Sequence, residues 1–307
     1  MQVSRKYQVA ADIALLAVTF IWGITFVVVK EALEAIGPYW FLAIRFLIAG
    51  SFLALLRYRA LRGIKTDTLK AGVIVGLALF GGYAFQTVGL QYTTASNAGF
   101  ITGLSVVLVP LIAGIMSRRL PHWAAMLGVG SATCGLALLS IQDNLRISYG
   151  DVLIFFCALC FAAHIILVGK YAPRVSTYHL AVLQIFTVGF ISLAVAPVLE
   201  TFPERLAPAV QIALVATAIP ATALAFLIQS AAQKFTSPTH TAVIFTMEPV
   251  FAGLGAWLLA GETLSLRQWV GGAAILFGML ITVLKMPAEE QESQHPGSQA
   301  AQTQTGA

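Results

Sequence analysis

A glutamate followed directly by a proline stands in an apolar stretch near the end of the chain. Glu248 and Pro249 lie within "VIFTMEPVFAG", and residues 241–260 contain no other charged side chain. A charged side chain in the centre of a membrane helix costs about 2.5–3.5 kcal/mol. We therefore expect Glu248 to face the interior of a helix bundle, where it contacts a substrate or carries a proton. The alternative is a protonated side chain that hydrogen-bonds to another helix and only stabilises packing.

Two prolines interrupt apolar segments at related positions. Pro249 lacks an N–H group, so the carbonyl of Phe245 loses its usual helical partner and the helix can bend. In a membrane such a carbonyl needs another donor or cavity water. Pro110 lies three residues past the position that corresponds to Pro249 in the first half of the chain. Paired interruptions are typical of transporter binding sites. We predict hinges at Pro110 and Pro249, the alternative being ordinary prolines of membrane helices.

Polar and aromatic side chains in other apolar segments could complete a binding site. His164 lies in the middle of one segment, one turn after Phe161. Histidine titrates near neutrality, so His164 is a substrate contact, a proton carrier or a hydrogen-bonded packing residue. Tyr83 and Gln86 share a helical face because they are three residues apart. A ring, an amide and a hydroxyl facing one space suit a zwitterionic or heteroaromatic solute. The predicted substrate-binding residues are Trp22, Thr25, Tyr83, Gln86, Asn97, Phe100, Phe161, His164, Gln229, Phe245 and Glu248.

Arg45 is a charged residue inside another apolar segment. It is expected to reach the membrane interface with its long side chain, or to pair with Glu31 or Glu34. Coupling to Glu248 is less favoured, because counting residues puts the two about 10 Å apart along the membrane normal.

The cysteines do not indicate a metal or redox site. Cys157 and Cys160 form a CxxC motif inside an apolar segment, with no second pair of ligands, so packing is the favoured interpretation. The sequence holds no Walker motif, no HExxH motif and no paired acids. It therefore indicates no metal, no cofactor and no ATP-driven reaction.

Membrane helices must position these residues. The chain of 307 residues is 58% hydrophobic and 10% charged, whereas soluble domains carry about 25% charged residues. An integral membrane protein is expected, and its all-α fold follows from apolar segments of about 20 residues, too long for barrel strands. The ten candidate spans are Asp12–Lys30, Tyr39–Leu56, Ala71–Leu90, Ala98–Met116, Ala124–Ile141, Val152–Val168, Leu180–Leu199, Ala209–Ser230, Thr241–Ala260 and Leu266–Leu284.

The second half of the chain repeats features of the first. Tyr39 and Gly50 recur as Tyr178 and Gly189, and "LQYTTASNAGFITGLSVV" resembles "AQKFTSPTHTAVIFTMEP". Five spans is an odd number, so the second unit is upside down relative to the first, as in many secondary transporters. We expect residues 1–145 and 146–286 to be two inverted five-helix repeats. Further matches are Gln91 with Gln233, Thr94 with Thr236, Trp22 with Phe161, Thr25 with His164, Gly128 with Gly271, and Gly135 with Gly278.

Lysine and arginine fall mainly on one side of these predicted spans. With the N-terminus in the cytoplasm, thirteen of them lie on the cytoplasmic side and four outside, which fits the positive-inside rule. Both termini are then cytoplasmic. The first span is interpreted as a retained helix rather than a signal peptide, and the polar residues 287–307 as a disordered cytoplasmic tail.

Several stretches resemble the EamA type of the drug/metabolite transporter superfamily. They are "IWGITFVVVK", "FLAIRFLIAG" and "MEPVFAGLGAWLLAGETLSLRQWVGGAAILFGMLI". The resemblance implies a ten-helix carrier with two repeats and a central cavity lined mainly by spans 1, 3, 4, 6, 8 and 9. It also implies transport of amino acids, metabolites, purines or drugs, often outward.

The sequence as a whole predicts a secondary transporter of the cytoplasmic membrane that exports a small metabolite, an amino acid or related compound, by alternating access. Its expected partners are the solute, the lipid bilayer and, as a possible coupling ion, protons. A monomer is expected, without nucleic acid. The alternatives are a drug or nucleobase carrier and, with less support, an intramembrane lipid-modifying enzyme.

Overall fold

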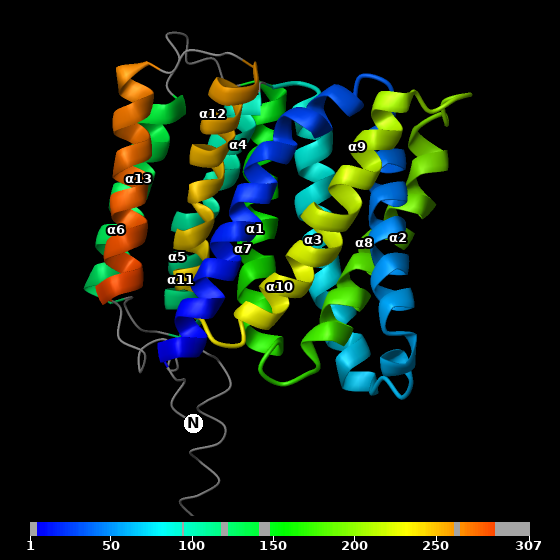
Figure 1. The fold of residues 1–307 in the computed structure, drawn as a ribbon, viewed down its shortest axis with the longest axis horizontal. Coiled ribbons are helices and arrows are strands. Elements are labelled where there is room, and N and C mark those ends of the chain that lie inside the picture. The colour runs from blue at the N-terminus through cyan, green and yellow to red at the C-terminus, as the bar shows by residue number, and fades with distance from the viewer. Residues whose placement is uncertain (1–4, 94, 118–121, 141–147, 261–264, 286–307) are drawn as a thin grey trace, which may run out of the picture.

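The computed structural model describes residues 5–93, 95–117, 122–140, 148–260 and 265–285. Within these ranges the chain forms helices joined by turns and short connections, and most of the helices run side by side along one common direction (Figure 1). The all-α architecture expected from the composition is confirmed for this part of the chain. The predicted tail, residues 287–307, lies outside the described residues.

Six helical stretches of the described residues are long and apolar enough to cross a membrane. Large apolar side chains cover the outside of the bundle, and Ile115 and Val198 are each 78% exposed. Lipid covers such a surface and water does not, so the protein crosses the membrane several times. The six stretches are α1 (Arg5–Ala32), α2 (Pro38–Leu56), α3 (Thr66–Leu90), α7 (Tyr149–Tyr171), α8 (Thr177–Leu199) and the composite of α9 (Pro208–Ala218), η2 (Ile219–Leu224) and α10 (Ala225–Ala232).

Four of the remaining helices come in broken pairs. The first pair is α4 (Ala95–Gly103) with α5 (Ser105–Ser117), and the second is α11 (Pro238–Phe245) with α12 (Met247–Ala260). The others are the short η1 (Tyr58–Leu61), α6 (Trp123–Ser140) and α13 (Leu266–Lys285).

The two breaks occur at Leu104 and Thr246, which are 142 positions apart in the sequence. At each break the backbone N–H bonds to the carbonyl three residues earlier, at 3.1 Å for Leu104 and 3.2 Å for Thr246. Such bonds tighten the last turn of a helix and end it. The hydroxyl of Thr246 also donates to the Val243 carbonyl, at 2.6 Å. Pro110 lies inside α5, six residues beyond its break, so its hinge role stays a prediction.

Glycines bring α6 and α13 into close contact. A methyl group added at Gly135 would lie 2.5 Å from the carbonyl oxygen of Gly271, and one added at Gly278 would lie 2.6 Å from that of Gly128. Only glycine lets the two backbones approach this closely, as in many membrane helix pairs. The contact is also reciprocal, because a shift of 143 positions relates Gly128 to Gly271 and Gly135 to Gly278.

A second reciprocal contact joins α2 and α8, at the opposite side of the bundle in Figure 1. Gly50 packs against the ring of Phe186, and Gly189 packs against the side chain of Leu47. A shift of 139 positions relates Gly50 to Gly189 and Leu47 to Phe186. Each of these contacts is therefore the counterpart of the other.

Candidate functional site

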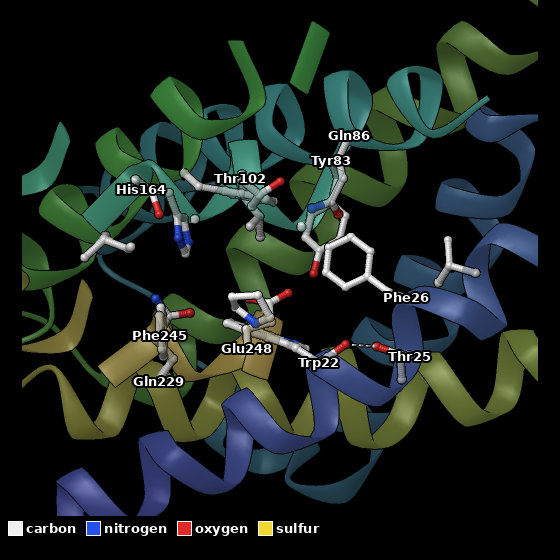
Figure 2. A pocket seen from close by; sticks show the side chains of 18 of the residues that line it. Trp22, Thr25, Phe26, Tyr83, Gln86, Thr102, His164, Gln229, Phe245 and Glu248 are labelled. Atoms are coloured by element: carbon white, nitrogen blue, oxygen red, sulfur yellow. Dashed lines mark hydrogen bonds between the residues drawn. The ribbon is translucent and has the colours of Figure 1, made fainter. Parts of the chain in front are cut away.

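The bundle contains a cavity that brings together residues from seven predicted spans (Figure 2). Its empty space is about 890 Å³, counting the part that is open to solvent. Pro249 lines it, and the side chains of Asn97 and Phe100 lie outside the described residues. Nine of the predicted substrate-binding residues line the cavity, and their role in binding stays a prediction. They are Trp22, Thr25, Tyr83, Gln86, Phe161, His164, Gln229, Phe245 and Glu248.

Aromatic rings form much of the cavity wall. The ring centre of Trp22 lies 5.1 Å from that of Phe245 and 5.6 Å from that of Phe226. Tyr83 meets Phe161 edge to face at 5.4 Å. Edge-to-face pairs at such distances stabilise one another beyond simple burial. These rings make this part of the cavity wall apolar.

A hydrogen-bonded chain fixes the orientation of His164, whose side chain is buried. Its Nε2 lies 2.7 Å from Oε1 of Gln184, and the amide nitrogen of Gln184 donates to the hydroxyl of Ser230 at 3.1 Å. Because the amide oxygen of Gln184 can only accept, Nε2 of His164 carries the proton. Its Nδ1 forms no hydrogen bond with the described residues and is left for a ligand in the cavity.

Gln229 offers a second unused acceptor. Its amide nitrogen donates to Gln233 at 2.9 Å, and the amide nitrogen of Gln233 donates to the Ile165 carbonyl at 2.9 Å. The amide oxygen of Gln229 is buried without a hydrogen-bond partner. A buried acceptor left unpaired costs about 1–3 kcal/mol, so this oxygen is a natural contact for an N–H or O–H group of a solute.

Glu248 lies in the first turn of α12, directly after the break at Thr246. The N–H groups of a first turn have no partner inside their helix, and the helix dipole stabilises negative charge there. Pro249 belongs to the same turn, where a missing N–H removes no helical hydrogen bond. The break thus explains how an acid and a proline stand together at a membrane cavity.

Arg45 does not reach the membrane interface, and it does not pair with Glu31 or Glu34. Its side chain is 3% exposed, whereas both glutamates are exposed. It lines the same cavity as Glu248. The interpretation of Arg45 as an interface residue is therefore wrong, because its guanidinium lies inside the helix bundle and not at the membrane surface.

The composite helix α9–η2–α10 is wound as a π-helix at residues Ile219–Leu224. Such widened turns occur often at functional sites. The indole N–H of Trp22 donates to the Ala221 carbonyl at 2.8 Å, and Nε of Arg45 donates to the Thr222 hydroxyl at 2.7 Å. The widened turn is thereby attached to α1 and α2 beside the cavity.

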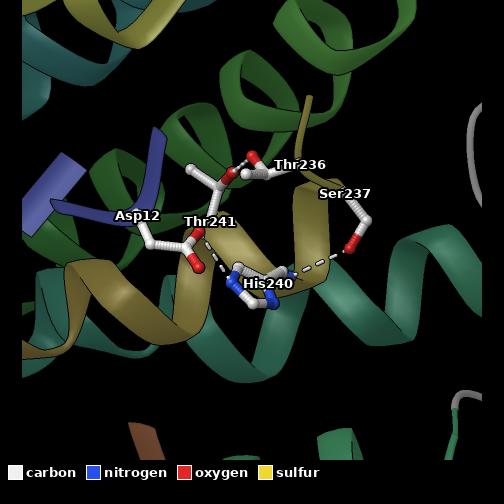
Figure 3. A network of polar contacts seen from close by, with 5 residues as sticks. All are labelled: Asp12, Thr236, Ser237, His240 and Thr241. Atoms are coloured by element: carbon white, nitrogen blue, oxygen red, sulfur yellow. Dashed lines mark hydrogen bonds and ion pairs between the residues drawn. The ribbon is translucent and has the colours of Figure 1, made fainter. Parts of the chain in front are cut away.

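A polar network joins α1 and α11 (Figure 3). Oδ1 of Asp12 lies 2.9 Å from Nε2 of His240, whose side chain is fully buried. Ser237 caps α11 by accepting from the His240 backbone N–H at 3.2 Å, and the hydroxyls of Thr236 and Thr241 lie 2.9 Å apart. The cavity lining extends to Val29 and Leu90, near the C-terminal ends of α1 and α3.

Sequence reasoning missed several residues of this site. Thr102 and Thr246 line the cavity, and only their position in apolar segments could have indicated them. Pro220, inside the π-helix, was a visible signal of an irregular eighth span. Nothing in the sequence joins Asp12 to His240, because they are 228 positions apart.

Comparison with known proteins agrees with this architecture. The sequence profile of the EamA-like transporter family matches residues 9–141 and again residues 148–284. An uncharacterized transporter of Archaeoglobus fulgidus is 38% identical over 284 residues, which are 92% of this chain and 88% of that protein. The uncharacterized inner membrane transporter YedA of Escherichia coli is 28% identical, over 88% of this chain and 90% of its own length.

A protein of known crystal structure shares the fold. It superposes with a TM-score of 0.76 at 19% sequence identity, and the match covers 94% of this chain and all of that one. The resemblance found in the sequence motifs is confirmed by the two profile matches, which together span most of the chain, and by the archaeal transporter: the chain belongs to the EamA-like transporter family.

Proposed function

We propose that the chain is a secondary transporter that moves a small metabolite, an amino acid or related compound, outward across the cytoplasmic membrane by alternating access. The observation that carries the proposal is the cavity in the middle of the bundle, which takes its lining from both profile-matched halves. Apolar walls with a few placed polar groups are typical of small-molecule sites. The free acceptors of His164 and Gln229 supply such groups.

The proposal includes two inverted five-helix repeats, residues 1–145 and 146–286, that together cross the membrane ten times. The breaks at Leu104 and Thr246 support it, because corresponding spans are interrupted at corresponding positions. The reciprocal glycine contacts of α6 with α13 and of α2 with α8 support it as well, since a twofold axis produces such pairs. Inverted repeats can exchange conformations, and the cavity then faces the other side.

The proposed location is the inner membrane, with both termini in the cytoplasm. The Escherichia coli relative carries that location in its name, and the excess of lysine and arginine on one side of the predicted spans supports the orientation. In this orientation the network of Asp12 and His240 lies toward the cytoplasmic end, and we propose that it closes this end and opens when solute enters from the cytoplasm. A monomer is proposed as the transporting unit, and protons carried by Glu248 are proposed to drive transport.

Flux and accessibility measured on the same protein test the proposal. Purified protein in proteoliposomes is screened with radiolabelled amino acids by counterflow. In a variant lacking Cys134, Cys157 and Cys160, a cysteine at Phe245 should react with small impermeant thiol reagents from both sides, and transported solute should slow the reaction. Leu111→Cys, on the outer surface of α5, is the control that solute should not protect. No flux for any solute, together with no reaction at Phe245→Cys, would refute the carrier.

The aromatic wall favours a second candidate, a carrier of nucleobases or flat drugs. Trp22, Phe226 and Phe245 form a continuous set of ring contacts, against which a planar heterocycle can stack. The same counterflow screen separates the candidates when purines and cationic dyes are included. Exchange of purines without exchange of amino acids would select the second candidate.

A further inference from the structure

We propose that Arg45 binds a carboxylate group of the transported solute at the wall of the cavity, between α2, α3 and the π-helix η2. This inference rests on the proposed transport function and adds the residue that would select the charge of the solute. It starts from a cation that the fold buries and does not neutralise.

Arg45 has no acidic partner among the described residues. Its side chain is 3% exposed, and no carboxylate of the described part lies within salt-bridge distance of the guanidinium. Glu248 lines the same cavity without reaching it. A guanidinium keeps its charge in proteins, and a buried ion without a counter-charge is strongly unfavourable. Ionisable residues inside a membrane bundle are therefore rarely kept without a function.

The neighbours of Arg45 hold the guanidinium in place but are all neutral. Its Nε donates to the Thr222 hydroxyl at 2.7 Å, and one terminal nitrogen lies 3.5 Å from the Ala221 carbonyl. The guanidinium carbon lies 5.1 Å from the ring centre of Tyr83 and 5.6 Å from that of Phe46. Such cation–π contacts compensate part of the charge. They orient the side chain and leave a net positive charge that no carboxylate of the described residues neutralises.

The position of Arg45 lets a solute supply that charge. Arg45 belongs to the lining of the cavity, together with Tyr83 and Glu248. A guanidinium carries five N–H donors in a planar fork that matches a carboxylate. The hydrogen bonds of Arg45 to Thr222, Ala221 and Tyr83 leave further N–H groups for a ligand. The free acceptors of the cavity, on His164 and Gln229, belong to α7 and α10 and not to α2. A carboxylate therefore has Arg45 as its one cationic contact among the described lining residues.

Matched pairs of a carboxylate and its uncharged amide test this assignment. The probes are L-phenylalanine with L-phenylalaninamide, and 3-phenylpropionate with 3-phenylpropionamide, measured by calorimetric binding to the purified full chain. Charge-assisted hydrogen bonds favour the carboxylate by about tenfold to a hundredfold. We expect that preference in the parent protein and its loss in Arg45→Gln. Arg57→Gln, which removes an exposed arginine at the end of the same helix, should keep it.

Two further variants separate binding from folding. Arg45→Lys keeps the charge and loses the planar fork, so the carboxylate affinity should fall severalfold while the amide affinity stays the same. Thr222→Val removes the clamp on the guanidinium and should lower the melting temperature while keeping the preference. If Arg45→Gln does not fold, Arg45→Lys decides the question by the same pair of affinities.

The assignment is overturned if the parent binds no carboxylate of the panel, or if folded Arg45 variants keep its preference over the amide. These outcomes are distinct from failure of the transport proposal. Carboxylate binding that depends on Arg45 without any flux would refute the carrier and keep the anion site. Flux of amides and amines that ignores Arg45 would keep the carrier and refute the anion site.

Discussion

Replacing Asp12 with asparagine should loosen the closed end of the bundle. The Asp12 carboxylate accepts a hydrogen bond from Nε2 of His240 at 2.9 Å, and the Asp12 side chain is only 13% exposed. A hydrogen bond to a charged group contributes about 1.5–3 kcal/mol and a neutral one about 0.5–1.5 kcal/mol. Asparagine keeps the shape and a neutral acceptor, so the closed end should lose about 1–1.5 kcal/mol. Since 1.4 kcal/mol is a factor of ten, the open fraction at this end should rise about tenfold.

Sided labelling measures this open fraction directly. In the cysteine-free background, Phe245→Cys is exposed to an impermeant thiol reagent on the cytoplasmic face of inverted vesicles. The rate of reaction should rise about tenfold with Asp12→Asn, because the reagent reacts only with the fraction open at that end. Asp67→Asn, at the start of α3, removes a charge from an exposed position and should leave the rate unchanged. An equal rate in the folded Asp12→Asn variant would show that this pair does not hold the end closed.

Three further predictions concern the proton, the aromatic wall and the helix pair. Glu248→Gln should abolish accumulation driven by a pH gradient and spare solute-for-solute exchange in counterflow, and a variant that still concentrates solute like the parent would rule out proton coupling through Glu248. Trp22→Ala should change which solutes are exchanged more than it changes the amount of folded protein, and loss of protein with unchanged selectivity would make the indole a packing residue. Gly135→Ala should destabilise the protein by about 1–3 kcal/mol, because the new methyl group would lie 2.5 Å from the Gly271 carbonyl oxygen. Gly130→Ala in the same helix, with open space around it, should leave the melting temperature in detergent unchanged or slightly raised.

The helical architecture could be predicted because the membrane imposes it. Apolar segments of about 20 residues must satisfy their backbone internally, so composition and length were enough to place α1, α2, α3, α7 and α8. The eighth span was predicted only by its bounds, Ala209–Ser230, and the π-helix inside it was not foreseen. The π-helix is contacted by Trp22 of α1 at Ala221 and by Arg45 of α2 at Thr222. Both partners are far from the π-helix in the sequence, so the only local signal is Pro220.

The candidate site was predictable to the extent that helical spacing fixes a face. Tyr83 and Gln86, or Phe161 and His164, share a face whatever their neighbours are, and the cavity receives both pairs. Arg45 was misplaced because depth along the sequence does not determine burial. The aromatic neighbours Phe46 and Tyr83 and the widened turn at Thr222 make its inward position possible.

The break between α11 and α12 places Glu248 and Pro249 at the cavity, and the break between α4 and α5 lies beside it as well. A membrane helix that ends in mid-bundle leaves carbonyls without partners at its C-terminal end and N–H groups without partners at the next N-terminal end. Such groups are tolerated only beside a polar, water-filled or ligand-filled space. Here Gly103 and Ser105 flank the first break, Thr246 and Glu248 lie at the second, and all four line the cavity. The backbone itself therefore supplies partial charges to that space. We therefore expect a solute with separated positive and negative groups to bind there more tightly than an apolar one.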